Sequence, residues 1–199
     1  MMNISDTPFP HIIIDDYFSD EELELIMREF NFLLPKFGDP SSYGGAENDD
    51  GTYLSDSTGL SLDDVYNNRN VSDILSISSK RLFTLPFWES IAKDHEFWEQ
   101  VLRSDSDHTK IRKYAPGEDY LSHQDCWVNV LVSWTLQEDT GGGGDLYFEQ
   151  HDLYIKSKTN RCVMFPGWVK HMVTPVVETD RFALTKFVHC ATKMTGTGD

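Results

Sequence analysis

From Lys113 to Asp125 the chain reads Lys-Tyr-Ala-Pro-Gly-Glu-Asp-Tyr-Leu-Ser-His-Gln-Asp, and this stretch ends in a histidine and a carboxylate two residues apart. If His123 and Asp125 lie at the start of a strand, their side chains point to the same face, so an imidazole and a carboxylate can converge on one ion. A His-x-Asp pair alone is expected by chance in a chain this rich in aspartate. A metal site therefore needs a third ligand from elsewhere in the chain.

His171 is the best candidate for that third ligand, within the segment Phe-Pro-Gly-Trp-Val-Lys-His-Met-Val-Thr-Pro-Val at residues 165–176. Two imidazoles and one carboxylate on one face of an ion suit non-haem Fe(II), because three coordination positions stay open for substrate and dioxygen. Structural zinc sites are usually closed by four ligands, mostly Cys and His, and the sequence has no cluster of cysteines. The three residues therefore favour an iron site over a structural zinc site.

Arg181 follows ten residues after His171 and opens the run Arg-Phe-Ala-Leu-Thr-Lys-Phe. On a strand Arg181, Ala183 and Thr185 share one face, so a guanidinium would point inward beside two small side chains that leave space. Arginine binds a carboxylate through two parallel hydrogen bonds. The pattern predicts a carboxylate pocket, although an isolated arginine more often forms a surface salt bridge.

The composition restricts the class of protein. The chain has 199 residues and a formal charge of −16, and we expect one domain, 1–199, without nucleic-acid partners because phosphate backbones would be repelled. Its longest mostly apolar stretch, Trp127 to Trp134, is far shorter than the roughly 20 residues of a membrane helix, so no membrane association is expected. The three cysteines form neither a disulfide framework nor a metal motif, and no signal peptide is visible, which predicts a cytoplasmic protein.

Apolar periodicity divides the chain into a helical part and a strand part. His11–Ile14 predicts a strand, and Ser19 with Glu22 forms a capping box before a helix that buries Leu23, Ile26, Phe30 and Leu33. Residues 37–70 predict a mobile loop or a lid, since Gly, Asp, Ser and Asn dominate there. Helices are expected over Val71–Leu82 and Pro86–Leu102, followed by strands over Thr109–Tyr114, Trp127–Gln137, Asp145–Glu149, Arg161–Phe165 and Arg181–His189. This order favours an α+β domain with its chemistry in the strand part.

The candidate residues also fit one known pattern. The chain resembles the 2-oxoglutarate- and Fe(II)-dependent oxygenases, in their prolyl 4-hydroxylase-like branch, over roughly residues 109–190. The elements of that pattern occur in order: Tyr114, Gly117, Tyr120, His123, Asp125, Gly143-Gly144, His171 and Arg181. More loosely, the stretch from Pro8 to Asp15 and the closing strand resemble the catalytic domain of ribosomal-protein prolyl hydroxylases.

The resemblance implies a double-stranded β-helix, a jelly-roll core at residues 109–190, with the helices of residues 1–108 packed on one sheet. It implies that His123, Asp125 and His171 hold Fe(II). It also implies that Arg181 pairs with the far carboxylate of 2-oxoglutarate and that Tyr114 hydrogen-bonds this cosubstrate. Thr135 aligns with a tyrosine that some members use for the same carboxylate.

The implied activity is hydroxylation of an unactivated C–H, coupled to conversion of 2-oxoglutarate and O2 into succinate and carbon dioxide, with ascorbate as a reductant. The first candidate substrate is a prolyl residue in a protein or peptide, and the acidic chain favours a basic partner. A small molecule, such as a free amino acid, is the second candidate. A third candidate is a catalytically silent β-barrel that binds a partner, which the intact candidate ligands disfavour.

Overall fold

The structure is a computed structural model that describes residues 1–92, 95–102, 104–125, 127–137 and 142–189. Its strands are all paired antiparallel and form two sheets. The larger sheet has the order β1-β2-β9-β6-β11-β4-β3 and the smaller the order β5-β10-β7-β8. The strands are β1 (Met2–Ser5), β2 (His11–Ile14), β3 (Thr58–Ser61), β4 (Ser106–Tyr114), β5 (Tyr120–His123), β6 (Val130–Gln137), β7 (Leu146–Phe148), β8 (Leu153–Ile155), β9 (Arg161–Pro166), β10 (His171–Val173) and β11 (Arg181–His189).

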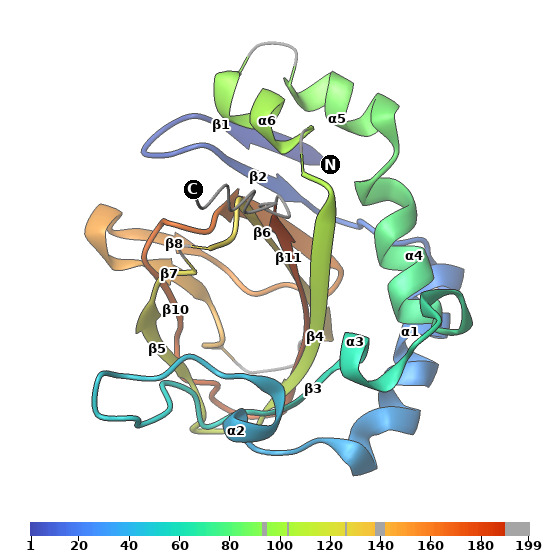
Figure 1. Ribbon diagram of the computed structural model, residues 1–199. Helices are drawn as coiled ribbons and strands as arrows, with labels where there is room; N and C mark the ends of the chain where they lie inside the picture. The colour runs from blue at the N-terminus through green and yellow to red at the C-terminus, as the bar shows by residue number, and fades with distance from the viewer. Residues whose placement is uncertain (93–94, 103, 126, 138–141, 190–199) are drawn as a thin grey trace, which may run out of the picture.

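Helices cover one face of the larger sheet, and the smaller sheet lies on its other side (Figure 1). The α-helices are α1 (Asp20–Leu33), α2 (Pro40–Tyr43), α3 (Leu62–Val65), α4 (Asp73–Leu82), α5 (Leu85–Ala92) and α6 (Glu96–Val101). Three 3-10 turns, Leu34–Lys36, Arg69–Val71 and Glu149–His151, join other elements. The expected class of mixed helices and strands is confirmed.

Helix α1 begins as the sequence predicts. The Ser19 hydroxyl accepts a hydrogen bond from the Glu22 backbone N–H at 3.2 Å, and the Ser19 N–H donates to the Glu22 carboxylate at 2.9 Å. These bonds satisfy two N–H groups at the helix start. The buried face of α1 then places Ile26 and Phe30 against the sheet.

Successive side chains of each central strand point to opposite faces of the larger sheet, so they contribute to two separate hydrophobic clusters. One cluster lies under the helices and the other lies between the two sheets. On β6, Val130, Val132 and Trp134 pack under the helices, whereas Leu131 belongs to the cluster that faces the smaller sheet. The same period of two applies to β11, where Leu184 and its even-numbered neighbours face the helices. The odd-numbered side chains of β11 therefore point between the two sheets.

Two predictions about the helical part need correction. Residues 37–70 are not simply a loop, because they contain α2, α3 and β3, and β3 pairs with β4 at the edge of the larger sheet. The single helix expected over Pro86–Leu102 is two helices, since His95 Nδ1 accepts the Phe97 N–H at 3.1 Å and so caps the start of α6. Residues 93–94 lie outside the described part of the chain.

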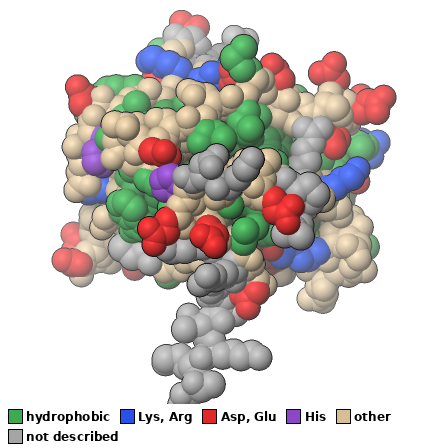
Figure 2. All heavy atoms as spheres, turned by 90° about the horizontal axis from the view of Figure 1, so that it is seen from above, with side chains coloured by type: hydrophobic (Ala, Val, Ile, Leu, Met, Phe, Trp, Pro, Cys, Tyr) green, Lys and Arg blue, Asp and Glu red, His purple; other side chains and the backbone are tan. Residues whose placement is uncertain are grey.

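The structure bears on three further expectations, which concern the cysteines, membrane association and the net charge. Cys162 is buried with a free thiol, whereas Cys126 and Cys190 lie outside the described residues. Within the described ranges no helix is both long and apolar enough to span a membrane. Acidic side chains are spread over the face drawn in Figure 2, in keeping with the charge of −16.

A buried lysine connects the helical layer to the sheet. Lys186 on β11 is 0 % exposed, and its ammonium group lies 2.9 Å from Asp107 Oδ2, 3.0 Å from Ser79 Oγ on α4 and 3.1 Å from Thr109 Oγ1. Three acceptors match the three N–H donors of an ammonium group. This cluster therefore fixes α4 against β4 and β11 through one fully paired charge.

We predict that Asp107→Asn lowers the free energy of unfolding by about 3 kcal/mol, because it leaves the Lys186 charge buried without a counter-ion. Lys186→Met should cost less, since Asp107 keeps its contact with Arg69 at 2.6 Å. Urea unfolding measures both. As a control, Glu149→Gln removes an exposed ion pair with Lys170 and should leave the unfolding midpoint unchanged. Equal stability of Asp107→Asn and the wild type would contradict the assignment.

Candidate metal centre

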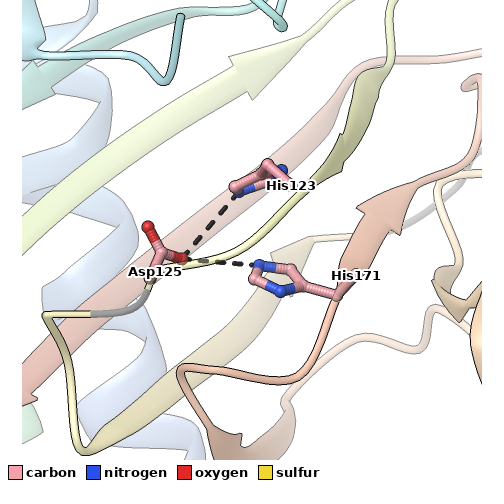
Figure 3. A group of neighbouring side chains, drawn as sticks. All are labelled: His123, Asp125 and His171. Carbon is pink, nitrogen blue, oxygen red and sulfur yellow. Dashed lines mark ion pairs between the residues drawn. The ribbon is translucent and has the colours of Figure 1, made fainter. Parts of the chain in front are cut away.

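Two strands of the smaller sheet bring the predicted ligands together. His123 ends β5 and His171 begins β10, and the two residues are direct partners in the antiparallel register. Asp125 follows in the loop after β5, and its Oδ2 lies 3.9 Å from His123 Nε2 and 3.6 Å from His171 Nε2 (Figure 3). All three ligand atoms lie within 4.8 Å of one another. The structure thus places the three side chains around one point.

Backbone carbonyls orient both imidazoles. His123 Nδ1 lies 2.8 Å from the Leu121 carbonyl oxygen, and His171 Nδ1 lies 2.9 Å from that of Val169. A carbonyl can only accept, so each Nδ1 carries the proton and each Nε2 presents its lone pair toward Asp125. This is the tautomer that a metal-binding histidine requires.

Burial keeps both rings uncharged. Burial, together with the neighbouring His171, lowers the pKa of His123 to about 3, and burial lowers the pKa of His171 to about 4. Burial also raises the pKa of Asp125 above its usual value. Removing charged groups from water is costly, and a divalent cation bound by two neutral imidazoles and a carboxylate would offset that cost for Asp125. Two nitrogens and one oxygen on one side are a donor set that fits Fe(II).

Arg181 lines the cavity that contains the three ligands, and it also lines an adjoining pocket whose wall includes Thr135. Arg181 is 4 % exposed; its Nη2 donates to Thr135 Oγ1 at 3.2 Å and its Nε to Ser157 Oγ at 3.3 Å. Tyr114 is its partner in the register of β4 and β11, and the guanidinium carbon lies 5.3 Å from the Tyr114 ring centre. The structure therefore brings together all three residues predicted to bind the cosubstrate.

Gly144 makes room for the arginine. Its φ is +64°, a conformation that favours glycine, and a Cβ there would come within 2.7 Å of Arg181 Cδ. Ala183 and Thr185 line the cavity beside the guanidinium, as the strand pattern predicts. Close packing on one side and small side chains on the other hold Arg181 at the cavity wall.

Sequence reasoning missed several residues at the site. Ser157, in the loop after β8, gives no local signal because its contact with Arg181 is purely tertiary. Lys110 and Arg112 share a strand face with Tyr114, so the period of two could have found them. Of the three tryptophans near the motifs, Trp134 is buried, whereas Trp127 is 57 % and Trp168 52 % exposed.

Comparison with known proteins agrees with the geometry. Residues 109–189 match the model of the 2OG-Fe(II) oxygenase superfamily. No curated protein sequence matches the chain. Among solved structures, a prolyl-4-hydroxylase from Pseudomonas putida has a TM-score of 0.62 at 16% identity, covering 90% of this chain and 92% of that one.

Two further solved structures show a similar fold. A prolyl hydroxylase from Trichoplax adhaerens, in complex with a peptide fragment of hypoxia inducible factor, has a TM-score of 0.64 at 15% identity, over 90% of this chain and 83% of that one. The viral collagen prolyl hydroxylase of Paramecium Bursaria Chlorella virus-1, in its 2OG complex, has a TM-score of 0.56 at 17% identity, over 90% of this chain and 95% of that one.

The part of the chain that matches the 2OG-Fe(II) oxygenase superfamily is the part that carries the candidate site. The matched segment contains the three candidate ligands and Arg181. Residues 109–189 of this chain are similar to the 2OG-Fe(II) oxygenase superfamily, and the fold of the chain is similar to that of prolyl hydroxylases.

We predict that the metal-free protein loses stability as the pH falls from about 7 to about 5. An unfolded histidine has a pKa near 6.5, whereas burial lowers the pKa of His123 to about 3 and that of His171 to about 4, so over this range these two side chains bind more protons in the unfolded chain than in the folded one. His171→Gln removes one of these groups and should reduce the slope. Urea unfolding at a series of pH values measures it, and an unchanged slope in the variant would count against buried neutral imidazoles.

Proposed function

We propose that this protein hydroxylates a prolyl residue in a protein or peptide, with Fe(II) held by His123, Asp125 and His171 and with 2-oxoglutarate as cosubstrate. The observation that carries the proposal is the single cavity lined by these three residues and by Arg181 and Tyr114. A metal ligand set and a carboxylate-binding arginine in one cavity match a cosubstrate that is both a chelator and a dicarboxylate. The three solved structures compared above, each of a prolyl hydroxylase, support the prolyl substrate.

The proposed architecture is the double-stranded β-helix of this superfamily. Its support is the pair of antiparallel sheets, whose facing sides enclose the cluster of Leu131, Phe148, Phe165 and Phe187. We assign residues 1–108 as a supporting part and residues 109–190 as the catalytic core of one domain. The helices packed on the outer face of the larger sheet leave its inner face free for the site.

Each proposed site residue has a specific task. The backbone carbonyls behind His123 and His171 keep both Nε2 lone pairs aimed at one point. Arg181, positioned by Thr135 and Ser157, would bind the far carboxylate of 2-oxoglutarate. Burial raises the pKa of Tyr114, so its hydroxyl stays protonated and can donate a hydrogen bond to the same cosubstrate.

When bound, Fe(II) with O2 and 2-oxoglutarate would supply the oxidising chemistry that inserts one oxygen atom into a C–H bond and releases succinate and carbon dioxide. The protein contributes position and exclusion of water. Tyr120 stacks on the His123 ring with centres 4.0 Å apart, and Phe165 packs edge-on against His171 at 4.9 Å. We further propose ascorbate as the reductant and a reducing, cytoplasmic compartment, which the buried free thiol of Cys162 supports.

We predict succinate formation coupled to a gain of one oxygen atom in a proline-containing peptide when Fe(II), 2-oxoglutarate and air are supplied. Asp125→Ala should abolish coupled succinate, because it removes one of three ligands. Mass spectrometry of a peptide panel beside free amino acids measures both products. Turnover with metabolites alone would overturn the peptide substrate, and turnover in Asp125→Ala would overturn the metal assignment.

We also predict that Arg181→Met weakens 2-oxoglutarate binding about tenfold or more, the effect of losing charge-assisted hydrogen bonds. Anaerobic calorimetry of the Fe(II) protein measures the affinity. Fe(II) binding itself should be unchanged, since the guanidinium is not a ligand. A variant with wild-type affinity for 2-oxoglutarate would remove Arg181 from the cosubstrate site.

A further inference from the structure

A second chamber adjoins the metal site on the side of β4. Its wall includes Asp125, Lys110, Arg112, Tyr120 and the turn 44–46 after α2. Trp127, which is 57 % exposed, lines the same chamber, so the chamber reaches the protein surface. Because Asp125 belongs to both spaces, a molecule seated in this chamber lies next to the metal centre.

Arg112 is a buried cation for which the proposed chemistry has no use. It is 5 % exposed; within the described part of the chain its guanidinium makes one hydrogen bond, from Nη1 to Thr185 Oγ1 at 3.4 Å, and its Nε has no partner. Its guanidinium carbon lies 5.3 Å from the Tyr120 ring centre and 5.5 Å from that of Tyr43. Among the described residues no carboxylate lies within 4.0 Å of it.

Lys110 places a second cation on the same strand face. It is 8 % exposed, and its ammonium group donates to the Gly44 carbonyl at 2.6 Å and lies 5.1 Å from the Phe187 ring centre. Burial, and then the charge of Arg112, lower the pKa of Lys110 to about 8. Two like charges in one buried chamber are costly, and Asp125, the carboxylate in the chamber wall, attracts both cations but is ion-paired with the two imidazoles of the candidate metal site instead.

The buried Lys186 and the partly buried Arg161 have counter-ions. Lys186 contacts Asp107 at 2.9 Å, and Arg161 contacts Asp15 at 2.6 Å. Arg112 and Lys110 form no ion pair with a carboxylate among the described residues, which indicates that their anion is supplied by a ligand.

We propose that Arg112 and Lys110 bind a carboxylate of the substrate and so hold the reacting carbon beside the metal centre. This inference rests on the proposed function and names its substrate class, a proline-containing molecule with an anionic group near the ring. The planar guanidinium, with an unused Nε–H, suits two parallel hydrogen bonds to a carboxylate. The carboxylate is either an acidic side chain beside the proline in a peptide or the α-carboxylate of a free amino acid.

The experiment uses two matched pairs of molecules. Acetylated, amidated peptides Gly-Glu-Pro-Gly and Gly-Gln-Pro-Gly differ only in a side-chain carboxylate, and L-proline and L-prolinamide differ only in the α-carboxylate. Binding is measured anaerobically by calorimetry with Fe(II) and 2-oxoglutarate present, and turnover is measured in air. We expect the charged member of one pair to bind about 10- to 100-fold more tightly in the wild type.

Arg112→Met should remove that preference without changing the affinity for 2-oxoglutarate, and Lys110→Met should reduce it. Arg112→Lys keeps the positive charge but cannot make two parallel hydrogen bonds, so it should retain part of the preference for the charged member. Arg28→Gln, at an exposed arginine on α1, is the matched control and should retain the wild-type preference. Circular dichroism before each titration verifies that the variants are folded.

The possible results separate the inference from the function on which it rests. A preference confined to the peptide pair assigns the carboxylate to a side chain, and one confined to the proline pair assigns it to a free amino acid. Hydroxylation that ignores the carboxylate, or an Arg112→Met variant that loses only 2-oxoglutarate affinity, overturns the inference and leaves the proposed function intact. If 2-oxoglutarate binds but no proline compound is bound or hydroxylated, the prolyl function fails and the inference with it.

Discussion

The antiparallel register between β5 and β10 is the constraint on which the site depends. It sets His123 opposite His171, and the ring centres of the two histidines lie 4.4 Å apart. A slip of one residue would turn one imidazole to the other face of the sheet and leave Asp125 with a single partner. The carbonyls of Leu121 and Val169, each two residues before its histidine, then fix the ring tautomers from the same backbone. The pairing of β5 with β10 thus sets the positions of the two histidines, and the backbone beside each of them sets its orientation and tautomer.

The larger sheet supplies what the smaller sheet lacks, which is cationic groups for anions. Its inner face presents Arg181 from β11 and Lys110 and Arg112 from β4, while its outer face carries the apolar contacts with the helices. Buried cations cost free energy, so they can be retained only on a sheet that is stabilised elsewhere. The helical layer, with Lys186 fully paired beneath α4, provides that stability on the opposite face.

The sequence predicted the parts of the site that depend on local spacing and missed those that depend on tertiary pairing. Arg181 opens a long strand, so the strand period places it. His123 ends β5 and Asp125 lies in the following loop, so their spacing of two residues, rather than a strand period, identifies the pair. Strand β3 has the composition of a loop and becomes a strand only by pairing with β4. Arg112 lies on the same strand face as Tyr114, as alternation predicts. Because charged residues are rarely buried, the sequence alone indicates that this face of the strand is exposed to solvent, whereas the structure buries it.

Charge acts on two length scales in this protein. The formal charge of −16 creates a field that salt screens over about 8 Å at physiological ionic strength. Inside the chamber, Lys110 and Arg112 lie within a low-dielectric wall, so salt screens their charges only weakly. An acidic exterior opposes the approach of a strongly anionic molecule, whereas the chamber attracts a single anionic group. A substrate that suits both the acidic exterior and the cationic chamber carries one carboxylate on an otherwise neutral or basic molecule. The net charge alone predicts only a basic partner, and the chamber adds that this partner has a carboxylate near its reacting proline.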